Sequence, residues 1–93
     1  MHYTVRWPDE GQSTCYSPSL VVREWLEPGR DYALDDFMNR VRRATAIANE
    51  RVQAKYGFFC SRANDQLAHL EDQQRRFAAL PGARVQVLSF DPA

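Results

Sequence analysis

The most constraining feature of this sequence is a long hydrophobic pattern with helical spacing between residues 34 and 80. Apolar side chains recur there every three or four residues, which places them along one face of a helix. The first half of this stripe consists of Leu34, Phe37, Val41, Ala44, Ala48, Val52 and Tyr56. The second half consists of Ala63, Leu67, Leu70, Phe77 and Leu80, with Gln74 as its polar member. Gly57 can adopt the left-handed conformation that ends many helices, so the pattern predicts two helices separated at residues 57–61.

Two short segments near the N-terminus predict a β-hairpin. Residues 2–7 alternate between apolar and polar side chains, which is typical of a strand with one buried face. A turn at residues 8–11 follows, in which Gly11 can adopt a positive φ. Residues 12–16 form the second arm, and their weakly apolar pattern suits a strand at the edge of a sheet.

A last strand is predicted over residues 84–90. Strict alternation divides its side chains into two faces, one with Val85, Val87 and Ser89 and the other with Gln86, Leu88 and Phe90. Both faces are apolar enough for a central strand or for a strand buried at an interface. Together with an excess of aromatic side chains, this pattern predicts a homodimer. The aromatic residues concerned are Trp7, Tyr16, Trp25 and Tyr32.

The segment between the hairpin and the long helix predicts a short helix that starts at residues 17–18, where Ser17 can cap it and Pro18 fits the first position, and that ends before Glu27. A strand is the alternative, because the two valines of this segment are β-branched. The predicted order is therefore β-β-α-α-α-β within a single domain of residues 1–93. Such an order indicates an α+β fold in which a three-stranded antiparallel sheet packs against a helical hairpin and a short helix.

Composition argues against several functional classes. The 93 residues contain 12 Lys and Arg and 12 Asp and Glu, and this zero net charge does not favour a general nucleic-acid binder. No apolar run approaches the ~20 residues of a membrane span, so we predict no membrane partner. The N-terminal residues show no signal-peptide pattern, so we expect a cytoplasmic protein whose two cysteines are free thiols.

The two predicted helix starts carry side chains that could bind a ligand. Free backbone N–H groups at a helix N-terminus suit an anion when hydroxyl and guanidinium donors lie nearby. The candidate ligand-binding residues are Tyr16, Ser17, Ser19, Tyr56, Cys60, Ser61 and Arg62. Ordinary helix capping is the competing explanation for the serines.

Cys60 is the basis of an enzymatic alternative. It lies at the start of the second long helix with Arg62 nearby, where the helix dipole and the guanidinium would lower the pKa of its thiol. The competing interpretation is that Cys60 packs inward with the two preceding phenylalanines as an unreactive side chain.

The histidines and cysteines do not predict a metal site. The possible ligands are His2, Cys15, Cys60 and His69. No pair among them has the Cys-x-x-Cys or His-x-x-x-His spacing that is typical of zinc sites. We therefore predict no metal and no cofactor, and we assign no catalytic residue.

A basic helix face is the basis of a second alternative, a single-strand RNA-binding module. The cations concerned are Arg40, Arg43, Arg51 and Lys55. Aromatic side chains of the sheet could stack on bases, as in other single-strand binders. A solvated face balanced by Asp36 and Glu50 explains the same pattern, and the neutral net charge favours that explanation.

Four segments resemble a small bacterial protein family of the nitrogen starvation response. They are YTVRWPD at residues 3–9, CYSPS at 15–19, IANERV at 47–52 and KYGFFCSRA at 55–63. Members of that family are encoded beside a nitrilase, a radical-SAM protein, an acetyltransferase and a flavoprotein. The resemblance implies a cytoplasmic accessory role in nitrogen-limited metabolism, and it implies no catalytic residue or cofactor.

These observations predict an accessory or interaction protein that binds a partner protein, such as an enzyme of the same pathway, or a small ligand. A small enzyme that uses Cys60 is the first alternative, and the RNA-binding module is the second.

Overall fold

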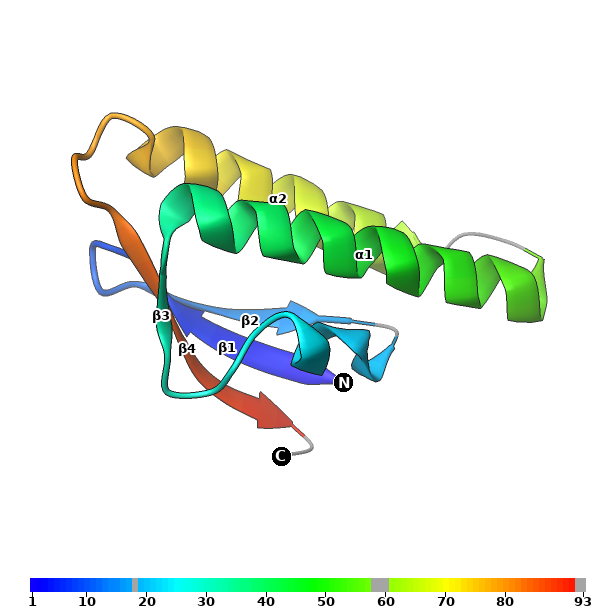
Figure 1. Cartoon of the computed structure of the whole chain (residues 1–93). Helices are drawn as coiled ribbons and strands as arrows, with labels where there is room; N and C mark the ends of the chain where they lie inside the picture. The colour runs from blue at the N-terminus through cyan, green and yellow to red at the C-terminus, as the bar shows by residue number, and fades with distance from the viewer. Residues whose placement is uncertain (18, 58–60, 92–93) are drawn as a thin grey trace.

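The computed structural model describes residues 1–17, 19–57 and 61–91. Its elements are β1 (His2–Arg6), β2 (Gln12–Tyr16), η1 (Leu20–Glu24), β3 (Asp31–Ala33), α1 (Leu34–Tyr56), α2 (Ser61–Phe77) and β4 (Arg84–Asp91). These strands form an antiparallel sheet in the order β2-β1-β4-β3. The helices α1 and α2 lie side by side over one face of the sheet (Figure 1). The predicted α+β fold with an antiparallel sheet and a helical hairpin is confirmed.

The prediction of a three-stranded sheet is wrong, because β3 adds a fourth strand directly before α1. Tyr32 of β3 lies opposite Val85 of β4 and is buried. Three residues with one buried side chain form too short an alternation to predict a strand. The observed order is therefore β-β-η-β-α-α-β rather than β-β-α-α-α-β.

The hairpin of β1 and β2 is confirmed, and β2 lies at the edge of the sheet as predicted. The N–H of Trp7 donates to the carbonyl of Gly11 at 2.7 Å and closes the turn. The positive φ of the turn belongs to Glu10, at 68°, and not to Gly11. The N–H of Gly11 instead donates to the Asp9 carboxylate at 2.9 Å, which stabilises the turn as Asp residues often do.

The short helix is also confirmed, as the 3₁₀ helix η1, so the strand alternative for this segment is wrong. Its cap is Ser19 and not Ser17, because the Ser19 hydroxyl accepts a hydrogen bond from the N–H of Val21 at 3.3 Å. Pro18, which we placed at the first helical position, lies outside the described residues. The buried side chains of Val21 and Val22 anchor η1 against the core beside α1.

The last strand contains a β-bulge. Thr4 of β1 pairs with Ser89, whereas the next residue, Val5, pairs with Val87. Leu88 is therefore an extra residue without a partner on β1. The prediction of strict alternation along this strand is wrong for this reason.

The bulge changes which side chains face the helices. Because the extra residue reverses the alternation, Phe90 lies on the same face as Val87. Phe90 packs edge-on against Tyr3, with the ring centroids 6.4 Å apart. The strand is central, as one of its two interpretations predicted, but it is not apolar on both faces. The homodimer stays a prediction that now rests on Tyr16 and Trp25, because Trp7 and Tyr32 are buried in the core.

The core lies between the helix pair and the sheet. Trp7 occupies its centre, stacked on Phe77 with the ring centroids 6.2 Å apart and edge-on to Phe37 at 5.8 Å. The buried side chains of α1 are Leu34, Phe37, Met38, Val41, Ala44 and Ala48. Gly57 ends α1 with a φ of 79°, which confirms it as the left-handed cap.

Candidate functional site

A polar hollow lies between the edge strand β2 and the first half of α2. It is lined by His2, Thr14, Tyr16, Arg62, Asp65, Gln66 and His69. We call it the β2–α2 surface. The four helical members are spaced three, four and seven residues from Arg62, so they form one polar row along α2. The surface therefore combines the side chains of a helix face with the backbone of an edge strand.

The backbone of β2 presents hydrogen-bonding groups to this surface. Hydrogen-bonded pairs join Trp7 to Gly11 at one end of the hairpin and Met1 to Ser17 at the other. Hydrogen-bonded and non-hydrogen-bonded pairs alternate along an antiparallel ladder. In this register, the β2 residues opposite His2, Thr4 and Arg6 therefore form no backbone hydrogen bonds with β1. The N–H and C=O groups that point away from β1 are those of Gln12, Thr14 and Tyr16.

One of these outward groups is bonded by α2. The N–H of Tyr16 donates to the side-chain Oε1 of Gln66 at 3.2 Å. The guanidinium of Arg62 lies over the Tyr16 ring, 4.0 Å from its centroid, and the His2 ring lies on another side at 5.5 Å. Tyr16 is therefore the residue through which the strand and the helix meet.

A second contact joins the strand to the helix one turn further along. The indole N–H of Trp7 donates to the hydroxyl of Ser13 at 2.8 Å. The same hydroxyl lies 3.4 Å from Nε2 of His69. The buried Trp7 therefore orients Ser13, which in turn holds the His69 ring beside the strand.

Two of the predicted ligand-binding residues, Tyr16 and Arg62, meet at this surface, although 46 positions separate them in the sequence. The serines of the first helix start have local roles instead. The buried Ser17 hydroxyl donates to the carbonyl of Ser19 at 2.7 Å, and the Ser19 hydroxyl accepts from Arg51 at 3.1 Å. Capping and turn formation thus explain both serines.

The remaining predicted residues lie elsewhere or were not described. Ser61 is the exposed first residue of α2 and does not line the hollow. Tyr56 is exposed at the end of α1, with the Lys55 ammonium 5.3 Å from its ring centroid. Cys60 lies outside the described residues, so its proposed reactivity stays a prediction.

Five members of the surface were not predicted as ligand-binding residues: His2, Thr14, Asp65, Gln66 and His69. The helical members left a detectable signal, since a polar row with helical spacing starts at Arg62. Thr14 left none, because the direction of its backbone groups depends on how β2 pairs with β1.

The other cysteine is part of the core. Cys15 is fully buried, and this burial raises the pKa of its thiol to about 12. Burial also raises the pKa of Tyr3, which lies opposite Cys15 in the sheet. Within residues 1–17, 19–57 and 61–91, no three His, Cys, Asp or Glu side chains gather as metal ligands would.

Two of the four cations of the predicted basic face, Arg40 and Arg51, form contacts within the fold, as does the neighbouring Arg42. Arg40 donates to the carbonyl of Trp25 at 2.7 Å and to Asp36 at 3.1 Å. Arg42 donates to Gln74 of α2 at 2.6 Å, and Arg51 bonds Ser19. These cations join α1 to its neighbours, so they offer fewer free groups to an RNA phosphate than their spacing indicated.

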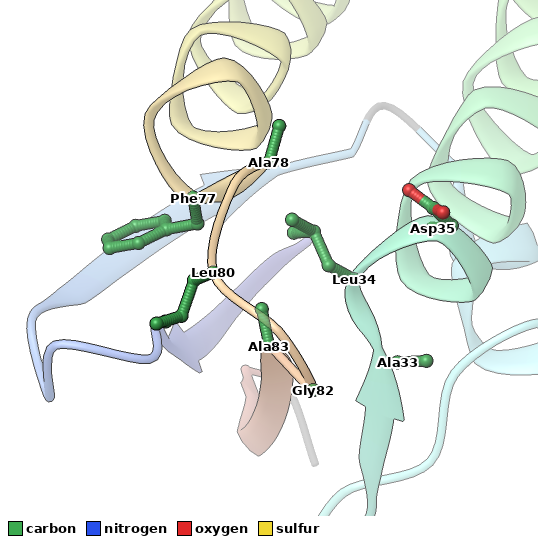
Figure 2. Close-up of a pocket in the computed structure, with 8 residues that line it drawn as sticks. All are labelled: Ala33, Leu34, Asp35, Phe77, Ala78, Leu80, Gly82 and Ala83. Atoms are coloured by element: carbon green, nitrogen blue, oxygen red, sulfur yellow. The ribbon is translucent and has the colours of Figure 1, made fainter.

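A second hollow lies at the opposite end of the helix pair. It has a volume of about 220 Å³ and is lined by Ala33, Leu34, Asp35, Phe77, Ala78, Leu80, Gly82 and Ala83. Figure 2 shows these side chains around the loop that joins α2 to β4, with Leu34 pointing toward that loop. Its lining is mainly apolar, and Asp35 supplies its one ionisable side chain among those residues. The β2–α2 surface therefore carries more of the groups that recognise a polar ligand.

No helix within the described residues is long and apolar enough to cross a bilayer.

Comparisons with known proteins place the chain in a family. No curated protein and no solved structure matches the chain. A family model described as nitrogen starvation-induced protein NitG matches residues 2–90. The predicted resemblance is thereby confirmed: the chain belongs to the NitG family of nitrogen starvation-induced proteins.

Proposed function

We propose that this protein is an accessory protein of nitrogen-limited metabolism that binds a partner protein through the β2–α2 surface. The observation that carries the proposal is the edge of β2, whose outward backbone groups lie beside the polar row of α2. Edge strands with unpaired N–H and C=O groups are ready binding sites for another chain. The mixed charge of the row suits a specific and reversible contact.

The family supplies the cellular context for the proposal. A protein induced by nitrogen starvation acts when nitrogen is limiting. A cytoplasmic location, and a partner among enzymes encoded nearby such as a nitrilase, are the parts of the proposal that extend beyond the family description. A homodimer is compatible with this role, since the surface proposed for the partner leaves the open face of the sheet uncovered.

Binding is favoured over catalysis by the side chains of the surface. Arg62, Gln66 and Thr14 are hydrogen-bonding groups without an activated nucleophile among them. The thiol of Cys15 is buried and its pKa is raised to about 12, so it is poorly suited to attack a substrate. The enzymatic alternative depends on Cys60 alone.

A pull-down with matched variants tests the proposal. The tagged protein is recovered from nitrogen-starved cells as the wild type and as the double variant Arg62→Ala/Gln66→Ala. The control is Arg84→Ala/Gln86→Ala, which removes the same two residue types from the exposed side of β4. We expect a partner that the wild type and the control recover and that the first variant loses. The protein and the recovered partner are then purified, and their affinity is measured by titration.

Equal recovery of every bound protein by both double variants would show that the partner does not bind through the β2–α2 surface. Recovery of no protein would favour a small ligand, and the same variants would then be compared for binding of metabolites from starved cells.

A further inference from the structure

We propose that the partner binds as an extended peptide segment, which adds a fifth strand along the edge of β2 and sets a carboxylate against Arg62. This inference rests on the proposed function and specifies how the β2–α2 surface would be used. It follows from the backbone of β2, the position of Gln66, the contrast between the two sheet edges and the charge of Arg62.

The backbone of β2 has the spacing that a fifth strand requires. Gln12, Thr14 and Tyr16 direct their N–H and C=O groups away from β1, at every second residue. An added strand bonds such groups at every second residue of the edge. Gln12 and Thr14 are exposed, so an approaching chain can reach them.

Gln66 already occupies part of the place of that strand. Its side-chain carbonyl accepts from the N–H of Tyr16 at 3.2 Å, as the backbone carbonyl of a paired strand would. A side-chain amide has the same donor and acceptor groups as a peptide bond. A bound segment would replace Gln66 at this N–H, and the freed amide could then bond the segment.

The two edges of the sheet differ in how they are protected. β3, at one edge, has three residues and carries Asp31, which forms an ion pair with Arg84 at 2.9 Å. β2, at the other edge, has five residues without a charge, a proline or a glycine. Short length and charge are the usual protections of an edge strand against pairing. β2 lacks both, which favours a role in pairing.

Arg62 determines the chemistry of the occupant. Its guanidinium stacks on Tyr16, and among the described residues it forms no ion pair. A guanidinium held by an aromatic ring still has free N–H groups that suit a carboxylate. A second copy of β2 would bring no carboxylate, because its five residues contain no acidic side chain. A partner segment with an Asp, a Glu or a free C-terminus fits better.

The test uses random ten-residue peptides displayed on phage in two libraries. One library presents a free C-terminus, and the other presents the same random segment within a protein loop. Selection on the wild-type protein should enrich extended sequences with an acidic residue, or sequences with a free C-terminus, and the better library identifies the source of the carboxylate. Enriched peptides are synthesised for titration.

Two variants and one spectroscopic measurement examine the binding mode. Thr14→Pro removes an outward N–H that the β1–β2 ladder does not use, and an edge strand tolerates proline at such a position. We expect the peptide to lose about tenfold or more in affinity. Arg62→Gln should cause a similar loss, whereas Arg84→Gln should cause none. In the wild type, the bound peptide should slow hydrogen exchange of the Thr14 amide. This measurement tests the binding mode even if the proline variant folds poorly.

Three results would overturn the inference. The first is enrichment of no peptide while the pull-down still shows a partner that depends on Arg62, which would leave the proposed function intact. The second is a peptide that binds without protecting the Thr14 amide. The third is protection of that amide in the free protein that rises with protein concentration, which would assign the edge to a second copy of the chain.

Discussion

Tyr3 lies directly opposite Cys15 in the pairing of β1 with β2, so the two side chains are neighbours on the face of the sheet that the helices cover. Both side chains are buried in the core. This pair links the edge strand to the core at the position next to Thr14 and Tyr16, so it holds in place the strand that the proposed partner would use.

The reactivity of Cys15 follows from this burial. In a Cys60→Ala background, the folded protein should react with a thiol reagent at neutral pH far more slowly than the protein unfolded in urea. The reason is that Cys15 is fully buried and its thiol is kept protonated by a pKa of about 12. A rate in the folded state close to the rate in urea would contradict this expectation.

Stability should fall in alkaline solution. The pKa of Cys15 is raised from 9.0 to about 12 in the folded protein. The contribution of its neutral thiol to the free energy of unfolding is therefore complete below pH 9 and is lost as the pH rises toward 12. Over that range the unfolded thiol ionises while the folded thiol does not, which lowers the free energy of unfolding by about 1.4 kcal/mol per pH unit at most. Tyr3, whose pKa is raised by the same burial, acts in the same direction.

Urea unfolding at a series of pH values measures this loss. Cys15→Ala serves as the control, since it removes the thiol and should flatten the dependence between pH 9 and 12. An equally steep fall in that variant would assign the effect to other groups.

Arg40 and Arg43 belong to the same basic cluster but should differ in their importance for stability. Arg40 donates to the carbonyl of Trp25 and to Asp36, and its guanidinium lies 4.8 Å from the ring centroid of Tyr32. Arg40→Ala should therefore lower the free energy of unfolding by about 1–3 kcal/mol, as for other hydrogen bonds from charged groups. Arg43 is exposed, and Arg43→Ala should stay within about 0.5 kcal/mol of the wild type. Chemical denaturation of the two variants makes the comparison, which fails if their midpoints shift equally.

Gly57 should be sensitive to substitution for conformational reasons alone. A Cβ added there would meet no described atom within 4 Å, so the cost arises only from the φ of 79°. Gly57→Ala should lower stability by roughly 1–2 kcal/mol. Gly57→Asn should cost less, because Asn tolerates the left-handed conformation better. Thermal unfolding ranks the three proteins, and a ranking with Ala above Asn would contradict the conformational explanation.

The helical hairpin was predictable because its pattern is long. Over more than forty residues, apolar spacing of three and four can satisfy only a helix, and Gly57 indicates where the first helix ends. Most positions that the pattern assigned to the core, such as Phe37 and Leu70, are buried, but Tyr56 and Leu80 at the ends of the two halves of the stripe are exposed. The β1–β2 hairpin was predictable for a similar reason, since alternation on both sides of a turn defines it locally.

The errors occur where a side chain's environment depends on distant pairing. β3 is a strand because Tyr32 lies opposite Val85, more than fifty residues away, and nothing in its own three residues requires this. The bulge at Leu88 likewise depends on how β1 aligns with β4. Local alternation cannot contain either piece of information.

The candidate site shows the same division. Arg62 and Tyr16 were predictable because cations and aromatic rings near helix starts have few structural roles. Ser17 and Ser19 were misleading, since capping and turn formation call for the same hydroxyls as ligand binding does. Gln66 belongs to a polar row that the sequence shows, but its role could not be identified, because that role depends on the N–H of Tyr16 that it bonds.

The bulge has a consequence for how the length of this chain can vary. Deleting Leu88 would place Ser89 next to Val87 and make the ladder with β1 continuous, while Phe90 would still face the helices. Deleting Gln86 would instead move Val85 to the solvent side, whereas deleting Ser89 would place Leu88 opposite Thr4 and leave Val87 and Phe90 on their face. Single-residue deletions in this strand should therefore be tolerated at Leu88 or Ser89 and be harmful at Gln86, so natural length variants among relatives should cluster at the bulge.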